Sequence, residues 1–356
     1  MKKKVLLGMS GGVDSSVAAV LLQKQGYEVI GCTMKLWEPR EEEQESTCCK
    51  NQAVYDAKRV CEQLGIPHDT INCKNEFKSK VVDEFIQEYK EARTPNPCVE
   101  CNKYLKFGVF YKKAKELGCD YIATGHYASI EFSDFYQQYV LKKSKEEKKD
   151  QTYFLYTIAK EKLQHILFPL QDCKSKEEIR KIADENHLLV AQKKESQEIC
   201  FVPDNDYQSF LKKYGRQVYP KGDIVQKDRK VLGQHEGFIN YTIGQRKGIG
   251  ISYQEPLYVL ALDKEKNEVV VGTQKQLYRK ELYAKEINWL VFDALKEPIQ
   301  CKAKIRYRAK EADCTVYPDK DIVKVVFKED QRAITPGQSI VFYDEEGVVL
   351  GGGKIS

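Results

Sequence analysis

The sequence predicts an α/β protein: an open, mostly parallel sheet with helices on both faces, followed by two small antiparallel β domains. Three observations lead to this fold class. Apolar residues 5–9 run into the polar stretch SGGVDSS and then into apolar residues at helical spacing, which is the order strand, turn, helix. Strands then alternate with helices as far as about residue 209. Beyond residue 210 the apolar period changes to two and helical patterns become rare.

The first 209 residues supply the elements of the sheet. Gly26, Gly65 and Gly118 each follow a helical stretch, where glycine is favoured because it adopts a left-handed conformation easily. Ser175 and Glu178 form a capping box that opens another helix. The expected strands are residues 28–34, 68–72 and 121–127, and the expected helices are residues 53–64, 77–89, 107–117 and 175–186.

The rest of the chain alternates polar and apolar residues or carries β-branched runs, as small antiparallel barrels or sandwiches do. The expected strands are residues 222–225, 257–260, 269–272, 301–307, 323–327 and 339–343. We therefore expect three domains: residues 1–209, residues 210–279 with a basic glycine loop at 244–250, and residues 280–356 with a turn at 335–338.

Composition narrows the class of protein. The 356 residues carry a net charge of +5, and the basic excess lies in residues 210–356, a distribution compatible with nucleic-acid contact. No apolar run is long enough for a membrane helix, and the N-terminus lacks a signal-peptide core, so we expect a cytoplasmic protein.

The twelve cysteines of such a protein are expected to be mostly reduced. Six in apolar contexts are interpreted as core residues: Cys32, Cys61, Cys73, Cys119, Cys301 and Cys314. The adjacent pair Cys48 and Cys49 receives no role.

The stretch SGGVDSS predicts a phosphate-binding loop. Its glycines let the backbone approach a ligand, its serines and aspartate suit a helix N-cap, and the helix start offers free N–H groups. A Walker A loop is excluded because no lysine stands in the stretch. Gly125 and His126 end the strand at 121–127, where ligands of α/β sheets gather, although a lone histidine is more often structural.

Cys98 and Cys101 form a C-x-x-C pair after a segment that two prolines stiffen, so we expect a loop at a defined surface position. Arg93, Lys103 and Lys106 lie close in sequence, and positive charge favours the thiolate. A structural zinc site would need a second ligand pair, which is absent, and a thioredoxin-type pair would open a helix. Spacing alone leaves the purpose of the pair open.

Eight segments, taken together and in order, closely resemble the bacterial tRNA-specific 2-thiouridylases. The first of them, SGGVDSS, resembles the pyrophosphate loop of the ATP pyrophosphatases. The resemblance covers essentially the whole chain. The segments are SGGVDSS, TPNP with the following CN-K, ATGHY, KDQ-x-YFLY, S-x-x-IC-F, GQRKG-x-G, RYR and TPGQS-x-VFY.

This resemblance implies an N-terminal ATP pyrophosphatase domain, a small central domain and a C-terminal β-barrel. It also implies thiolation of the wobble uridine of tRNAs for lysine, glutamate and glutamine. The residues implied to hold ATP are Gly8, Met9, Ser10, Gly11, Gly12, Val13, Asp14, Ser15, Met34 and Gly125. Those implied to meet the target base are Asn96, Pro97 and Cys98, and those implied to contact tRNA are His126, Lys149, Asp150, Gln151, Arg306, Tyr307 and Gln338.

The chemistry that the resemblance implies begins with adenylation of the uridine C2 oxygen, which turns a poor leaving group into AMP. Mg²⁺ and the pyrophosphate loop neutralise the phosphates. A persulfide on Cys200 then attacks C2 of the flipped base, and Cys101 reduces that sulfur to leave a disulfide. The sulfur donor, whether a cysteine desulfurase, a relay protein or free sulfide, stays open.

One position departs from the family pattern. Many members have aspartate where this chain has Cys98. Three thiolates, from Cys98, Cys101 and Cys200, could instead hold a four-iron four-sulfur cluster whose open iron binds hydrosulfide. The persulfide and cluster routes both stay open here, and both require Cys101 and Cys200.

Two other functions remain as alternatives. One is a pyrophosphatase-type ligase that acts on a small substrate, which would need neither the β domains nor paired cysteines. The other is a non-catalytic tRNA-binding protein, against which the intact SGGVDSS loop and both cysteines argue. Release of AMP that depends on tRNA would separate them.

Overall fold

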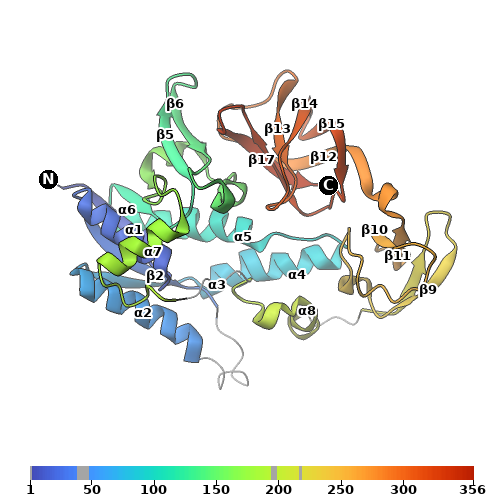
Figure 1. Ribbon diagram of the computed structural model, residues 1–356, viewed down its shortest axis with the longest axis horizontal. Helices are drawn as coiled ribbons and strands as arrows, with labels where there is room; N and C mark the ends of the chain where they lie inside the picture. The colour runs from blue at the N-terminus through green and yellow to red at the C-terminus, as the bar shows by residue number, and fades with distance from the viewer. Residues whose placement is uncertain (1, 38–47, 194–198, 216–218) are drawn as a thin grey trace. The chain divides into compact units, whose positions relative to one another are not determined.

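The computed structural model describes residues 2–37, 48–193, 199–215 and 219–356 (Figure 1). The chain divides into two compact units. The first comprises Met1–Val81, Cys98–Gln197 and Gly347–Val349, and the second comprises Val82–Pro97, Glu198–Glu346 and Leu350–Ser356. Among the described residues, no helix is both long and apolar enough to span a bilayer. The boundaries of the three predicted domains stay a prediction.

The first unit is built on a parallel sheet of order β3-β2-β1-β4-β7. β1 (Lys4–Gly8) lies at the centre between β2 (Glu28–Lys35) and β4 (Tyr121–Ala123), with β3 (His68–Asn72) and β7 (Ile166–Leu167) at the edges. The apolar run in β1 is fully buried because both faces of a parallel sheet are covered. The predicted open, mostly parallel sheet is confirmed.

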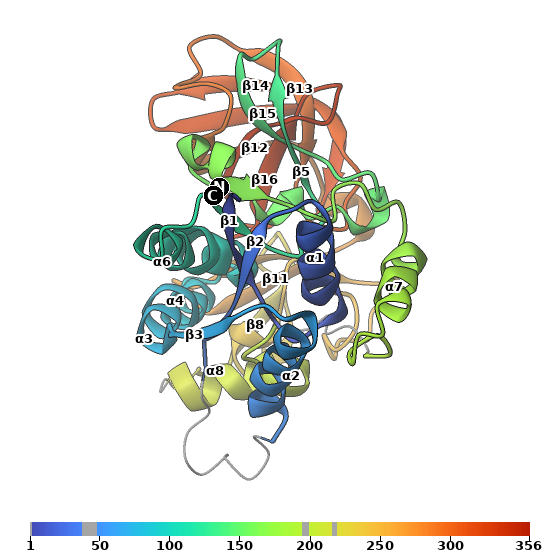
Figure 2. The same cartoon turned by 90° about the vertical axis from the view of Figure 1, so that its left-hand side faces the viewer.

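Helices cover both faces of this sheet, as predicted. Figure 2 shows α1 (Val13–Lys24), α2 (Cys48–Leu64) and α7 (Lys176–Glu185) on one side of the strands, and α6 (Phe110–Glu116) on the other. Gly26 has a φ of +86° just past α1, which explains the glycine at that helix end. The Oγ of Ser175 accepts a hydrogen bond from the Glu178 backbone N–H, so the predicted N-cap of α7 is confirmed, whereas the Glu178 carboxylate accepts from the Lys174 N–H at 2.8 Å and does not complete the predicted capping box.

The segment around the cysteine pair is helical, and the predicted loop is wrong. α5 (Pro97–Glu100) begins at Pro97 and continues as the π-helix Cys101–Val109, which leads into α6. Proline suits the first position of a helix, because an N–H there has no partner within the helix. The predicted helix 77–89 is likewise divided into α3 (Lys74–Phe77), a π-helical turn and α4 (Asp83–Lys90).

The remaining elements of the first unit follow β4. The hairpin of β5 (Ser129–Ser133) and β6 (Gln138–Lys142) is antiparallel. Short 3-10 turns at Glu147–Lys149, Thr152–Phe154 and Lys160–His165 then lead to β7. These turns return the chain to the edge of the sheet.

The second unit contains two helices and a small sheet. The helices are α4 (Asp83–Lys90) and α8 (Tyr207–Gly215). The sheet has the order β10-β11-β8-β9, with bounds Tyr258–Asp263, Glu268–Gly272, Gly222–Val225 and Val231–His235. Its pairs are antiparallel as predicted, except that β8 and β11 run parallel.

A closed antiparallel barrel ends the chain, as predicted (Figure 1). Its order is β12-β15-β14-β13-β16-β17, with bounds Tyr278–Trp289, Ile322–Arg332, Ala312–Asp319, Ile299–Lys304, Ser339–Tyr343 and Val349–Ile355. Cys301 and Cys314 lie opposite each other in register, with their Sγ atoms 3.7 Å apart. All six cysteines interpreted as core residues are buried: Cys32, Cys61, Cys73, Cys119, Cys301 and Cys314.

Candidate functional site: a phosphate loop and a cysteine pair

The SGGVDSS stretch forms the turn between β1 and α1, as predicted. Gly12, rather than a serine or the aspartate, is the N-cap of α1, and it makes no side-chain cap bond. The hydroxyls of Ser15 and Ser16 donate instead to the Gly12 carbonyl, at 3.1 and 2.9 Å. Gly11 has a φ of +70°, and a Cβ on it would lie 2.3 Å from the Ala53 carbonyl oxygen. Residue 11 therefore has to be glycine for the loop to keep this shape at the N-terminus of α1.

Asp14 lies in the first turn of α1 and is held by two side chains that the sequence analysis missed. The Tyr127 hydroxyl donates to Asp14 Oδ1 at 2.9 Å, and the Lys176 ammonium donates to the same oxygen at 2.5 Å. Lys176 is distant in sequence, at the start of α7. Tyr127 directly follows Gly125 and His126 at the strand end. Its position after these two candidate residues is the sequence signal that could have identified it.

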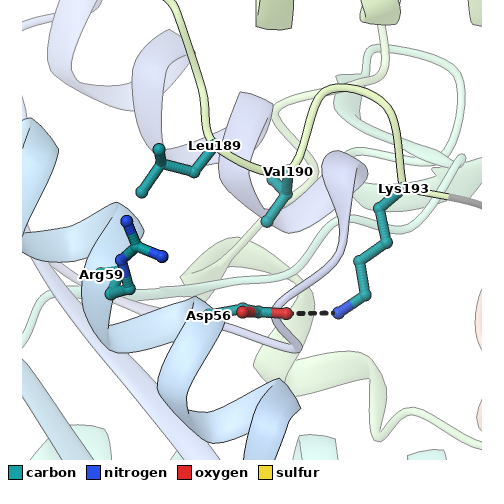
Figure 3. Close-up of a pocket in the computed structure, with 5 residues that line it drawn as sticks. All are labelled: Asp56, Arg59, Leu189, Val190 and Lys193. Atoms are coloured by element: carbon teal, nitrogen blue, oxygen red, sulfur yellow. Dashed lines mark hydrogen bonds and ion pairs between the residues drawn. The ribbon is translucent and has the colours of Figure 1, made fainter.

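Lys193 is a second cation beside the loop that sequence reasoning missed. Its ammonium donates to the Gly11 carbonyl at 2.9 Å and to the Asp56 carboxylate at 2.8 Å. Figure 3 shows Lys193 reaching from its loop to Asp56 on α2. The two side chains line a pocket of about 330 Å³ together with Arg59, Leu189 and Val190. Two cations, Arg59 and Lys193, and one carboxylate, Asp56, thus line this pocket beside the loop.

Two further predicted nucleotide residues lie near this loop. A Cβ on Gly125 would lie 3.0 Å from the Asp14 carbonyl carbon and the Ser15 nitrogen, so the end of β4 packs on the first turn of α1. Met34 lies near the end of β2, the strand beside β1. Strands β1, β2 and β4 are parallel, so their carboxyl ends share one edge of the sheet. That edge is where ligands of such sheets bind.

His126 is buried and has two polar neighbours. Its Nδ1 lies 2.7 Å from the Thr124 Oγ1, and its Nε2 lies 3.2 Å from the Lys106 ammonium. An ammonium can only donate, so Nε2 accepts and the proton lies on Nδ1. Burial, reinforced by the charge of Lys106, holds the pKa of His126 well below its usual range. The ring is therefore neutral at neutral pH.

The cysteine pair shares Lys106 with His126, which places it near the end of β4. Cys101 is 8% exposed, so the predicted surface position applies to Cys98 alone. Although Cys98 is exposed, desolvation by the protein around it raises its pKa, as it raises the pKa of Cys101, and Lys106 offsets this only in part. The predicted thiolate is thus wrong for the free protein.

The other cations counted from the sequence have different partners. Arg93 forms a two-pronged pair with Glu88, through bonds of 2.9 and 2.8 Å. Lys103 lies over the Tyr104 ring, 5.0 Å from its centre. At Cys98 and Cys101, desolvation therefore raises the thiol pKa by more than the nearby positive charge lowers it.

The pKa direction predicts how fast the exposed thiol is alkylated. Because the thiolate is the nucleophile, the rate of Cys98 labelling by iodoacetamide should keep rising with pH beyond the value for a free cysteine, about 8.5. Mass spectrometry of the peptide at a series of pH values measures this. A midpoint of the labelling rate below about pH 8.5 would contradict the raised pKa of Cys98.

The predicted tRNA residues at 149–151 lie beside Tyr127. The Gln151 side-chain oxygen accepts from the Tyr127 N–H at 3.0 Å, and the Gln151 N–H donates to the Tyr127 carbonyl at 2.8 Å. Asp150 is buried and accepts from the Ser144 N–H and the Thr152 hydroxyl. Lys149 is half-buried in the turn before them. Roles of these residues in tRNA contact stay predictions.

Cys200 is exposed and lies in the second unit, next to an aromatic anchor. Phe201 is buried, and its ring lies 5.3 Å from that of Phe85 on α4 and 5.2 Å from that of Phe210 on α8. Residues 93–97, which lead to Cys98, follow α4 directly. Phe201, directly after Cys200, thus packs on α4, the helix that residues 93–97 follow. The first residues of the S-x-x-IC-F segment lie outside the described residues.

The remaining predicted tRNA and base residues lie in the second unit. The Arg306 Nη2 donates to the carbonyls of Ile243 and Ala333 and to the Thr335 hydroxyl. Lys304 lies over the ring of Tyr307 at 5.7 Å. The Gln338 side chain donates to the Thr94 carbonyl, next to Asn96 and Pro97.

The structure shows no site for the predicted iron–sulfur cluster: among the described residues, no three Cys, His, Asp or Glu side chains form a group that could hold a metal ion. We therefore derive no step through a cluster.

Three protein-family models match successive parts of the chain. They are described as a tRNA methyl transferase HUP domain over residues 3–204, a tRNA methyl transferase PRC-barrel domain over residues 208–273, and an aminomethyltransferase beta-barrel domain over residues 279–355. A solved structure, a 4-thiouridine synthetase–RNA complex with bound ATP, covers 59% of this chain and 50% of that chain, at 19% identity and a TM-score of 0.35.

Curated relatives match over the full length. A protein of Clostridioides difficile (strain 630) is 50% identical over 357 residues, covering 100% of this chain and 98% of its own. One of Acetivibrio thermocellus is 51% identical over 358 residues, covering 99% of each. Both are named tRNA-specific 2-thiouridylase MnmA. About half of all positions are thus shared with each relative from end to end, and the chain belongs to the tRNA-specific 2-thiouridylase family.

Proposed function

We propose that this chain uses ATP to replace the C2 oxygen of the wobble uridine in tRNA with sulfur. One observation carries the proposal: Lys106 contacts His126 and acts on the thiols of Cys98 and Cys101, while Gly125, next to His126, packs on the phosphate loop. Thiols near the end of β4, the strand whose end packs on the expected nucleotide loop, support this proposal. A small-substrate ligase would need no such thiols.

In the first step, the uridine O2 attacks the α-phosphorus of ATP, and pyrophosphate leaves. The free N–H groups at the start of α1 would bind the phosphates, and Lys176 and Lys193 supply positive charge beside them. The loop fits Mg²⁺ through the single carboxylate of Asp14, since Mg²⁺ commonly takes one or two carboxylates plus substrate phosphates. When bound, Mg²⁺ would neutralise phosphate charge.

In the second step, sulfur replaces the activated oxygen. The terminal sulfur of a Cys200 persulfide attacks C2, a C–S bond forms, and AMP leaves with the oxygen. The Cys101 thiolate then attacks the inner sulfur of Cys200. The S–S bond of the persulfide breaks, its electron pair stays on the sulfur bonded to C2, and 2-thiouridine leaves behind a Cys101–Cys200 disulfide.

Two co-reactants complete the cycle. A dithiol or small-thiol reductant must supply two electrons to reopen the disulfide. A sulfane-sulfur donor, such as a cysteine desulfurase or a relay protein, must then rebuild the persulfide. Because the pKa of Cys101 is raised in the free protein, its attack needs deprotonation, and a base or an approaching positive charge would assist it.

The test is nucleoside mass spectrometry of unmodified tRNA incubated with the chain, ATP, a reductant and a persulfide donor. We expect 2-thiouridine at the wobble position of tRNAs for lysine, glutamate and glutamine, with one AMP released per thiolated base. Release of AMP with a small acceptor but without tRNA would favour the ligase alternative. Binding of tRNA without AMP release would favour the non-catalytic alternative.

A further inference from the structure

A turn of the C-terminal barrel holds the segment that precedes the cysteine pair. The turn comprises residues 335–338, between β15 and β16, and we call it the barrel turn. Its backbone is fixed to the last strand, since the Gly337 N–H donates to the Ile355 carbonyl at 2.9 Å and the Ile355 N–H donates to the Gln338 carbonyl at 2.8 Å. The barrel turn is therefore a rigid part of the barrel.

The barrel turn contacts residues 93–97, which we call the base segment because it carries Asn96 and Pro97. The Thr94 N–H donates to the Pro336 carbonyl at 2.9 Å. In return, the Gln338 Nε2 donates to the Thr94 carbonyl at 2.9 Å and to the Pro95 carbonyl at 3.4 Å. These bonds matter because the segment has two prolines without N–H groups, so it cannot form a regular ladder of its own.

The fit between the two is close enough to require glycine. Gly337 has a φ of +89°, and a Cβ there would lie 2.9 Å from both the nitrogen and the oxygen of Thr94. These are backbone atoms, which cannot move aside as the end of a flexible side chain can. Residue 337 therefore has to be glycine for the base segment to keep its position.

Hydrogen bonds and ion pairs fix both ends of this contact within the same unit. Arg306 holds the start of the barrel turn through the Ala333 carbonyl at 2.7 Å and through the Thr335 hydroxyl. Lys354 of β17 pairs with Glu84 of α4 at 3.2 Å, and Arg93 pairs with Glu88 of the same helix. The helix before the base segment and the barrel that carries the turn are thus joined independently of Gln338.

We propose that Gln338 is a positioning residue: it clamps the Thr94 and Pro95 carbonyls so that Asn96 and Pro97 are presented to the target base. This role differs from the direct tRNA contact predicted from the sequence, and it rests on the proposed function. This role predicts that kcat and the binding constants respond differently when the clamp is lost. Loosening the clamp lowers kcat for thiolation and leaves the KM for ATP and the affinity for tRNA unchanged.

The test uses two variants of the full chain. Gln338→Met keeps the length of the side chain, removes its donor and adds no charge that could repel tRNA. Gly337→Ala puts a methyl against Thr94, and Gly26→Ala is its matched control, since Gly26 has a φ of +86° and nothing within 4 Å of its Cβ position. The control adds the same backbone strain without the collision.

Two measurements decide the proposal. Hydrogen exchange of tRNA-free protein should show the Thr94 amide, whose N–H donates to the Pro336 carbonyl, exchanging about tenfold faster or more in both variants, and unchanged in Gly26→Ala. Thiolation kcat should fall by about 10- to 100-fold, with tRNA affinity within about twofold of wild type. Weakened tRNA binding with normal kcat at saturation, or unchanged hydrogen exchange, would contradict the positioning role of Gln338.

A wild-type chain that thiolates no tRNA would instead contradict the proposed function. The hydrogen-exchange result needs no tRNA, so it separates these two failures.

Discussion

Cys101→Ser and Cys200→Ser should each lower 2-thiouridine formation by about 1,000-fold or more, because each removes a sulfur atom that the proposed reaction uses. A serine hydroxyl at residue 200 cannot carry a persulfide. A serine hydroxyl at residue 101 cannot break the bond between the two sulfur atoms, so the base stays attached to Cys200. Nucleoside mass spectrometry of tRNA after a timed reaction measures both losses.

Cys98→Ser is the matched comparison for these two variants. It makes the same chemical change three residues before Cys101, at a thiol that the persulfide route does not use for sulfur transfer. We expect it to keep at least about a tenth of the wild-type rate, a loss typical of a changed contact rather than of a removed nucleophile. If Cys98→Ser were as inactive as the other two, and iron and colour left the protein with it, a cluster would replace the persulfide.

A trapped intermediate gives the same prediction a second readout. In Cys101→Ser the adenylation step remains, so AMP should still be released once per active site when tRNA and a persulfide donor are present. The tRNA should then stay covalently bound through Cys200 and come free on addition of a small thiol. Cys200→Ser should show no such adduct. An adduct in both variants would contradict the assignment of Cys200 as the sulfur carrier.

The phosphate loop was predictable because its determinants are local. A strand, two glycines and a helix start follow one another within SGGVDSS, and the structure keeps that order. Its side-chain partners were not predictable, since Lys176 and Lys193 lie more than 160 residues along the chain from Asp14 and Gly11. Such pairs depend on how α7 and the loop after it pack on the sheet, and one sequence without an alignment does not show that.

At the cysteine pair, the predictions made from neighbouring residues alone are wrong. Prolines and an asparagine before Cys98 suggested a loop, but Pro97 begins a helix and buries Cys101. Nearby lysines suggested thiolates, but desolvation depends on the surrounding fold, and it outweighs the charge of Lys106.

Gly11→Ala should raise the KM for ATP by at least about 100-fold, or abolish detectable nucleotide binding, because it changes the shape of the phosphate loop. The added Cβ would lie 2.3 Å from the Ala53 carbonyl oxygen, at a φ of +70°. The loop or the start of α2 has to move, and the N–H groups of α1 then no longer converge on one phosphate. Calorimetric titration with ATP measures the loss, and tRNA-dependent AMP release should fall with it.

Gly118→Ala controls for the strain of this substitution. Gly118 has a φ of +67°, nothing lies within 4 Å of its Cβ position, and it follows α6 away from the phosphate loop. A left-handed alanine costs about 1 kcal/mol wherever it lies, so both variants should lose similar stability from strain, and Gly11→Ala should lose more from the collision. Only Gly11→Ala should lose ATP. Equal and small effects of the two variants on ATP binding would mean that nucleotide does not bind at this loop, and the adenylation step would then have no site in the first unit.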